Sequence, residues 1–334
     1  MPVIRIRAIA PLWPAPWCGR GRRGRSGAHG GTAGRSPRRG HEVQDVTMKI
    51  DAHHHVWDLA VHPQDWISPE FAPVIGRDFD TGDWRAVAEP AGVTHAVIVQ
   101  TVPQDSETPY LLDLAAQHPH VLGVVGWVQF GATDLTARLD ALSDHPASDL
   151  LVGLRDLSEQ REDAAWLAGP EAARTFAAAG ERDLTIDLLI REEHLAAAAE
   201  AVRAHPDTWF VVDHLAKPDL DRTTPGEWAA SMAPLAEAPN VALKFSGYAT
   251  LTADLAAADL TLAGYLNAAL EKFGPRRVMF GSDWPVSLVG GSYAQVVAAA
   301  EAALAVVDAD DGLRGEFFTG AATRWYGLEP PTAA

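Results

Sequence analysis

The sequence contains a single cysteine, Cys18, which lies close to its N-terminus. The rest of the chain therefore cannot use a disulfide, a catalytic thiolate or a cysteine-ligated zinc ion. The sequence also has no apolar run of the roughly 18 residues that are needed to cross a bilayer. These absences favour a cytoplasmic protein without a membrane partner, whose chemistry depends on side chains other than cysteine.

Basic residues are scarce outside the first 47 positions. The formal net charge is −17, yet residues 1–47 hold nine arginines against two acidic residues, so the remainder carries −24. Because so acidic a body repels polyanions, we expect no nucleic acid as a partner. A small-molecule substrate is predicted instead, and the sequence makes no prediction of oligomeric state.

The first 47 residues lack hydrophobic periodicity. They are rich in Gly, Pro and Arg, as in GRGRRGRSGAHGGTAGRSPRRG, and such a composition cannot bury a core. We predict a disordered extension over residues 1–47. Met48 directly precedes the first apolar run, which favours a misassigned start over a nucleic-acid-binding arm or a transit peptide.

Eight short apolar runs alternate with helix-like segments in residues 48–330. Near-continuous apolar strands separated by amphipathic helices indicate a parallel sheet covered by helices. Eight such units predict an α/β fold, a (β/α)8 TIM barrel, in a single domain. No Gly-x-Gly-x-x-Gly motif follows any run, which disfavours a dinucleotide-binding sheet. The strands are expected at residues 49–57, 94–100, 121–129, 150–157, 184–190, 209–215, 241–248 and 277–286.

Reactive side chains stand at the ends of three of these runs. His53 and His55 are two residues apart in the first run, so the alternation of a strand turns both imidazoles to one face and His54 to the other. His214 ends the sixth run, and Asp283 follows the eighth. Because the C-terminal ends of barrel strands surround one mouth, we expect His53, His55, His214 and Asp283 to converge there. The long connection over residues 62–80 is expected at the same mouth, where it could cover the site.

Imidazoles and a carboxylate suit proton transfer or metal binding. Each residue also has a structural interpretation, because histidines often satisfy hydrogen bonds of the core and an Asp often caps a helix. Pro285 makes a helix cap at Asp283 less natural, and the predicted convergence favours a functional site. Asp213, next to His214, is expected to face away from the site and to be structural.

Other side chains near the strand ends are candidates for substrate binding. Arg155 offers a planar fork to a carboxylate or to hydroxyl groups, although a salt bridge to Asp156 or to another acid is nearly as favoured. Lys244 is expected either to reach the mouth or to extend outward. The remaining candidates are polar or aromatic groups that would line a pocket, namely Gln100, Trp127 and Trp284.

Six motifs follow one another along the chain: DAHHHVWD, IVQTVPQDSETPYLLDLAAQHPHVLGVVGWV, VGLRDL, VVDHLAKP, LKFSGY and VMFGSDWPV. In this order they resemble the signatures of the amidohydrolase superfamily, in the branch that contains sugar-lactone hydrolases such as fuconolactonase and the related 2-pyrone-4,6-dicarboxylate lactonase. The resemblance extends from about residue 49 to residue 328, and it rests on the motifs together rather than on any one of them.

The resemblance implies a hydrolase that opens a small lactone by attack of water. Asp283 would be the acid that handles the proton of the water, and His53, His55 and His214 would activate the carbonyl group. It also implies either one divalent ion, with zinc favoured and His53, His55 and Asp283 as ligands, or no ion, because the branch includes members that act without metal. Dinuclear relatives carry a carboxylated lysine on the fourth strand, where this chain has Arg155, so we expect no two-metal centre.

Three other functions remain open at this point. The superfamily includes metal-dependent, non-oxidative decarboxylases, which usually carry a histidine that the fifth run, LTIDLLI, does not provide. Amide hydrolysis would use similar activation of the carbonyl group with a poorer leaving group. A barrel that only binds a ligand is disfavoured, because three histidines and an acid at one mouth suit proton chemistry better.

Overall fold

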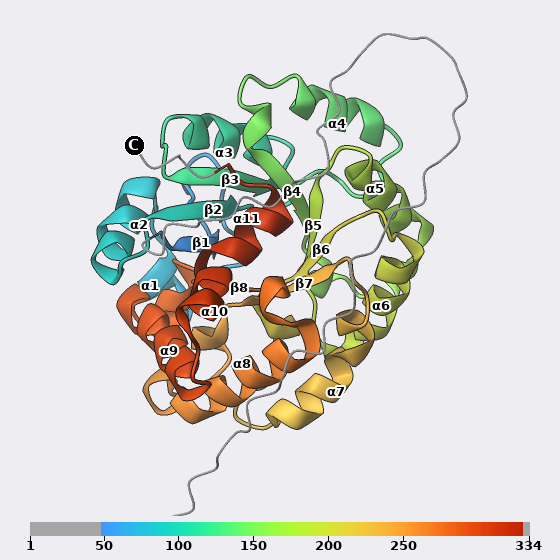
Figure 1. Ribbon diagram of the computed structural model, residues 1–334. Coiled ribbons are helices and arrows are strands. Elements are labelled where there is room, and N and C mark those ends of the chain that lie inside the picture. The colour runs from blue at the N-terminus through green and yellow to red at the C-terminus, as the bar shows by residue number, and fades with distance from the viewer. Residues whose placement is uncertain (1–47, 330–334) are drawn as a thin grey trace, which may run out of the picture. The chain divides into compact units, whose positions relative to one another are not determined.

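A computed structural model describes residues 48–329 of the chain (Figure 1). The predicted extension, residues 1–47, lies outside the described residues. Eight parallel strands pair in the order of the sequence and form a nearly closed barrel, which confirms the TIM barrel and each of the eight predicted strands. The strands are β1 (Ile50–His54), β2 (His95–Val99), β3 (Val121–Gly126), β4 (Leu151–Asp156), β5 (Thr185–Leu188), β6 (Phe210–Val212), β7 (Val241–Phe245) and β8 (Val278–Phe280).

Helices surround the strands on the outside of the barrel (Figure 1). Several begin with a capping box, in which an N-cap side chain and a residue three positions later satisfy each other's free backbone N–H groups; one example is Thr224 with Glu227. The helices are α1 (Ala72–Ile75), α2 (Thr81–Ala88), α3 (Glu107–Ala116), α4 (Leu135–Ser143), α5 (Pro170–Gly180), α6 (Leu195–Ala204), α7 (Pro225–Ala236), α8 (Asp259–Phe273), α9 (Tyr293–Val306), α10 (Asp311–Gly315) and α11 (Ala321–Tyr326).

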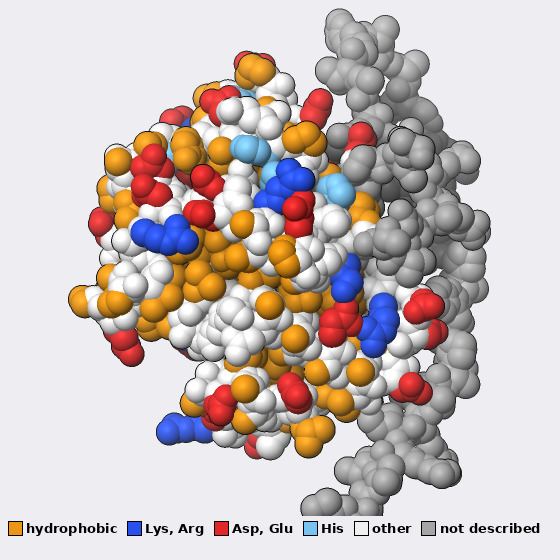
Figure 2. Space-filling view, turned by 90° about the vertical axis from the view of Figure 1, so that its left-hand side faces the viewer, with side chains coloured by type: hydrophobic (Ala, Val, Ile, Leu, Met, Phe, Trp, Pro, Cys, Tyr) orange, Lys and Arg blue, Asp and Glu red, His pale blue; other side chains and the backbone are white. Residues whose placement is uncertain are grey.

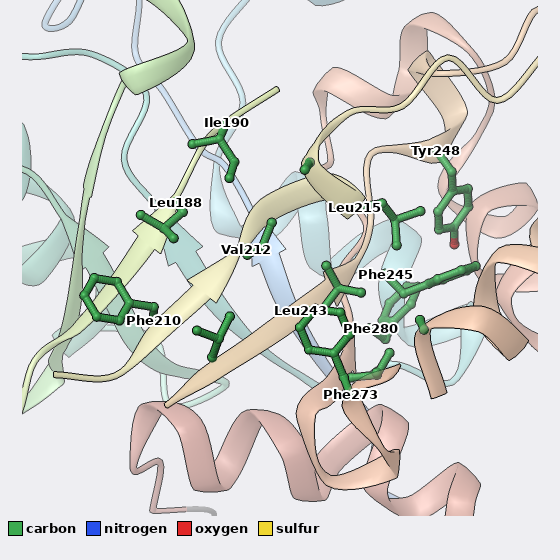
Figure 3. Close-up of a cluster of buried hydrophobic side chains, with 14 of the residues drawn as sticks. Leu188, Ile190, Phe210, Val212, Leu215, Leu243, Phe245, Tyr248, Phe273 and Phe280 are labelled. Atoms are coloured by element: carbon green, nitrogen blue, oxygen red, sulfur yellow. The ribbon is translucent and has the colours of Figure 1, made fainter. Parts of the chain in front are cut away.

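The main hydrophobic core lies between the strands and the helices. Phe210 and Val212 of β6, together with Leu243 and Phe245 of β7, point outward into this layer (Figure 3). Complete burial of a side chain of this kind stabilises the fold by roughly 1.5–3 kcal/mol. The residues between them turn the other way, since Val211 belongs to a separate cluster inside the barrel.

Helix α11 closes the barrel at the end where the strands begin. Trp325 and Tyr326 of this helix pack in the inner cluster with Ile50 of β1, Val97 of β2 and Met279 of β8. The predicted site residues lie at the opposite end, where the strands finish.

The segment after β8 joins that end of the barrel to β1. An isolated parallel bridge pairs His54 with Trp284. The backbone N–H of Asp283 donates to the carbonyl oxygen of His53 at 2.8 Å, and that of His55 donates to the carbonyl oxygen of Trp284 at 2.7 Å. These bonds fix the eighth-strand acid beside the histidines of the first strand.

The predicted long connection lies at the same end. Phe79, in this connection, packs edge-on against Trp284 with ring centroids 5.1 Å apart. Within residues 48–329 no helix has the length and apolar character that crossing a membrane requires. Figure 2 shows one face of the molecule, on which acidic and basic side chains are interspersed with apolar ones.

Candidate active site

The structure brings the three predicted histidines and the predicted acid together. Oδ1 of Asp283 lies 3.4 Å from Nε2 of His55 and 3.8 Å from Nε2 of both His53 and His214. The four residues come from the C-terminal ends of β1, β6 and β8, and all are at most 5% exposed. One carboxylate oxygen therefore faces three imidazole nitrogens in a largely buried setting.

His55 and His54, next to each other at the end of the first strand, are held by different partners. Nδ1 of His55 lies 2.7 Å from the carbonyl oxygen of Val99. Because a carbonyl only accepts, Nδ1 of His55 carries a proton, and in the neutral ring the lone pair of Nε2 faces the site. His54 turns the other way, as predicted: its Nδ1 lies 3.0 Å from the carbonyl oxygen of Val97, and its ring packs against Trp84.

His214 stands at the start of a left-handed turn after β6. Its φ is 52°, and the three residues that follow have φ between 52° and 60°. This conformation costs about 1–2 kcal/mol for each non-glycine residue, and strain of this kind concentrates at functional sites. The turn places the ring of His214 4.4 Å from that of His53 and sets Nδ1 2.9 Å from Oγ of Ser246.

The environment sets the charges of the site. Burial lowers the pKa of His53 well below its ordinary value and that of His214 to about 4. Burial alone would raise the pKa of Asp283, but His214, His55 and Lys217 together hold it below its usual value. At neutral pH the site thus pairs an ionised carboxylate, which has a free position for a proton, with neutral imidazoles at His53 and His214.

The position of Asp213 differs from the one that the sequence predicted. Instead of facing away, its Oδ1 lies 3.2 Å from Nδ1 of His53 and 3.0 Å from Nζ of Lys244. Its Oδ2 accepts a hydrogen bond from Nη1 of Arg155 at 3.2 Å. The expectation was wrong because β6 ends at Val212, so the alternation of a strand does not extend to Asp213 and His214.

Lys244 points into the barrel rather than outward. The side chain is completely buried, and Nζ donates to Oδ2 of Asp187 at 2.5 Å and lies 3.1 Å from Nδ1 of His53. Burial raises the pKa of Asp187 to about 6, against the opposing effect of Lys244. Burial would also raise the pKa of Asp213, but Lys244 and His53 hold it well below its usual value.

Arg155 and Gln100 form a pair next to His53. Nε2 of Gln100 donates to the carbonyl oxygen of Arg155 at 3.0 Å, and Nη2 of Arg155 donates to the carbonyl oxygen of Gln100.

The salt bridge of Arg155 is made with Asp213, whereas Asp156 pairs with Arg161. Oε1 of Gln100 and Nε of Arg155 are buried without a hydrogen-bond partner among the described residues.

The two predicted tryptophans differ in their surroundings. Trp127 is 8% exposed and lies outside the hydrophobic clusters, and its Nε1 has no hydrogen-bond partner in residues 48–329. Trp284 belongs to the main hydrophobic core and packs against Phe79. The structure therefore leaves Trp127 as a candidate for substrate binding and places Trp284 in the core.

Sequence reasoning missed Asp187 as part of the site and misplaced Asp213. A signal for Asp187 existed, because a lone acid within the apolar run LTIDLLI must find a buried partner. The same argument applies to Lys244 in the run VALKF. The acid on β5 and the cation on β7 each need a buried partner, and in the structure they pair with each other across β6.

An open depression of about 410 Å³ lies at the same end of the barrel. The loops that follow β5, β6 and β7 form its walls. Its two cations are paired to one acid, because Nζ of Lys217 donates to Glu159 at 2.7 Å and Arg191 lies 3.2 Å from Glu159. The residues that line the depression are Arg191, Lys217, Pro218, Asp219, Asp221, Thr250, Leu251, Thr252 and Ala253.

The site has the donors for one divalent ion. The potential ligand atoms of His53, His214 and Asp283 lie within 4.8 Å of one another, and all three residues are buried. Two imidazoles and a carboxylate are a ligand set that zinc and related ions accept. His55 contributes a further nitrogen 3.4 Å from the same carboxylate oxygen.

A (β/α)8 barrel with three histidines and an aspartate at its mouth suits a barrel hydrolase, and sequence comparison identifies the family. A family model described as amidohydrolase matches residues 50–328. The chain belongs to the amidohydrolase family and is a hydrolase.

Individual relatives point in the same direction. An L-fucono-1,5-lactonase of Burkholderia ambifaria is 34% identical over 74% of this chain and 84% of its own length. An L-fucono-1,5-lactonase of Burkholderia multivorans is 31% identical, over 86% of this chain and 98% of the relative. A crystal structure of a Burkholderia multivorans amidohydrolase with bound zinc is 30% identical, with a TM-score of 0.78, and the match covers 84% of this chain and all of that one.

Proposed function

We propose that this protein hydrolyses a small sugar lactone to the corresponding hydroxy acid. The observation that carries the proposal is the position of Asp283, whose Oδ1 lies within 3.8 Å of three buried imidazole nitrogens. The similarity to two L-fucono-1,5-lactonases supports the choice of a lactone.

In the proposed mechanism Asp283 acts as a proton shuttle. Its carboxylate takes a proton from water while the water oxygen forms a bond to the lactone carbonyl carbon. His53, His55 and His214 stabilise the negative charge that develops on the carbonyl oxygen. When the ring C–O bond breaks, Asp283 returns the proton to the leaving alkoxide and becomes a carboxylate again.

One divalent ion, with zinc the favoured ion, would be held by His53, His214 and Asp283, with His55 beside them. Such an ion would polarise the carbonyl group and lower the pKa of water. The proton transfers assigned to Asp283 need no other acid among the described residues.

The pairing of the nearby cations favours a neutral lactone over a dicarboxylate. Arg155 is bonded to Asp213, and Lys217 and Arg191 share Glu159. A substrate carboxylate would have to compete with these buried or half-buried acids for each cation. Hydroxyl groups of a sugar could instead use the free hydrogen-bonding atoms of Gln100, Arg155 and Trp127.

A panel of lactones tests the proposal. Acid release from aldono-1,5-lactones, aldono-1,4-lactones and pyrone dicarboxylate lactones is followed with a pH indicator, with and without a chelator. We expect the fastest turnover with a neutral sugar 1,5-lactone. Release of carbon dioxide from hydroxybenzoates, or hydrolysis of amides without hydrolysis of any lactone, would contradict the proposal and favour a decarboxylase or an amide hydrolase.

A further inference from the structure

A lysine ammonium occupies the centre of a second cluster of potential metal ligands. His53, Asp187 and Asp213 each offer a ligand atom within 4.8 Å of the others. Nζ of Lys244 lies 2.5 Å from Oδ2 of Asp187, 3.0 Å from Oδ1 of Asp213 and 3.1 Å from Nδ1 of His53. A primary ammonium has three N–H donors, and three acceptors lie within reach.

The charges around this cluster are balanced. Asp187 and Asp213 face two cations, Lys244 and Arg155, and the side chains of Lys244 and both acids are completely buried. Solvent therefore screens these charges very little, and each depends on its neighbours. Without Lys244, two carboxylates and an imidazole nitrogen would surround an unfilled space. Only Arg155 would then remain to balance the two negative charges. Such a ligand set suits a divalent ion.

We propose that His53, Asp187 and Asp213 form a second cation site, which Lys244 fills permanently with its own ammonium. The chain thus supplies through a side chain the positive charge that a second metal ion would supply. One consequence concerns His53, whose Nδ1 faces Lys244 while Nε2 faces Asp283. The ammonium confines metal binding to the cluster of His53, His214 and Asp283.

The test compares the zinc content of four purified proteins: wild type, Asp187→Asn, Lys244→Ala and the double variant. Each is equilibrated with zinc chloride and desalted, and zinc per chain is measured by atomic emission. Asp187 is the informative partner because it belongs only to the second cluster. We expect Lys244→Ala to retain one more zinc ion than wild type, and the double variant to lose this extra ion. Asp187→Asn alone should leave the zinc content unchanged.

Stability provides a second readout that does not depend on lactone turnover. Lys244→Ala should melt at a lower temperature than wild type, and zinc should raise its Tm more than that of the double variant, because a ligand that binds only the folded state stabilises it. A folded Lys244→Ala protein with the zinc content of wild type would overturn the proposal. So would a gain of zinc that persists without Asp187, or a Lys244→Ala chain that stays unfolded both with and without zinc.

Discussion

At the scale of single residues, the position of His214 depends on a glycine in the next loop. Gly247 has φ 71°, a left-handed conformation, and a Cβ built on it would lie 2.7 Å from Cγ and Nδ1 of His214. The imidazole therefore occupies the space that a side chain at position 247 would need. Any residue other than glycine there must displace His214 from this position.

Gly247→Ala is expected to reduce lactone turnover by at least about tenfold, because displacement of a positioned group by roughly 1 Å can cost far more than its binding contacts. Both kcat/KM and urea unfolding should be measured. Gly92→Ala is the matched control, since Gly92 has φ 77° but no atom within 4 Å of its Cβ position. Equal loss of turnover in the two variants would show that backbone strain, rather than contact with His214, is responsible.

At the scale of elements, the connection from β2 to α3 is organised by a buried acid. Oε1 of Glu107 accepts hydrogen bonds from the backbone N–H of Thr101 at 2.8 Å and from its hydroxyl at 2.6 Å, and Oε2 accepts from the N–H of Val102 at 3.1 Å. Glu107 thus connects the start of α3 to Thr101 and Val102, which follow Gln100 in the loop after β2. Burial raises the pKa of Glu107 from 4.5 to about 7.

This shift predicts a pH dependence of stability. Because the folded-state pKa is raised, the contribution of Glu107 is complete below pH 4.5 and is lost as the pH rises through about 7. The free energy of unfolding of wild type should fall by about 3 kcal/mol more than that of Glu107→Gln over this range. Urea unfolding at several pH values measures the difference. Parallel pH profiles for the two proteins would contradict the assignment.

At the scale of the whole molecule, a chain of polar contacts connects the two ends of the barrel. The hydroxyl of Tyr326, on α11, donates to Oδ1 of Asp187 at 2.7 Å, and Asp187 binds Lys244, which contacts His53. The helix that closes the bottom of the barrel is therefore bonded to the groups beneath the site. Stability of the closure and order of the site should depend on each other.

Tyr326→Phe removes the first of these contacts and should reduce the free energy of unfolding by about 1.5–3 kcal/mol, since the lost hydrogen bond has a charged, buried acceptor. The comparison is Tyr265→Phe, which loses a 2.7 Å hydrogen bond to the backbone carbonyl oxygen of Thr223. Because this acceptor is neutral, loss of the hydrogen bond should reduce the free energy of unfolding by only about 0.5–1.5 kcal/mol. Urea unfolding checks both, and an equal or smaller loss for Tyr326→Phe would contradict the connection.

The fold was predictable because the barrel depends on repetition. Each strand is an apolar run bounded by turns, and the position of each of the eight could be read from the sequence. The ends were less accurate: the sixth run, 209–215, contains a strand of only Phe210–Val212. Hydrophobicity does not distinguish a buried strand from the buried turn that follows it, so the left-handed turn at His214 had no signature in the sequence.

The convergence of His53, His55, His214 and Asp283 could be predicted because it follows from strand ends in a barrel. The orientation of Asp213 and the pairing of Lys244 could not, because they depend on turn geometry and on contacts between strands that are distant in the sequence. Trp284 illustrates a further limit: an aromatic at the mouth can pack inward on Phe79 as readily as it can line a pocket.

The most direct test of Asp283 as the proton shuttle is the kcat/KM of Asp283→Asn with the lactone on which wild type is most active. The substitution preserves the shape of the side chain and removes its ability to accept a proton. Asp207→Asn, at an exposed position before β6, is the control. We expect a loss of about 10²–10⁴ in kcat/KM for Asp283→Asn with the fold intact, and no loss for Asp207→Asn. Near-wild-type turnover by a folded Asp283→Asn protein would contradict this role of Asp283.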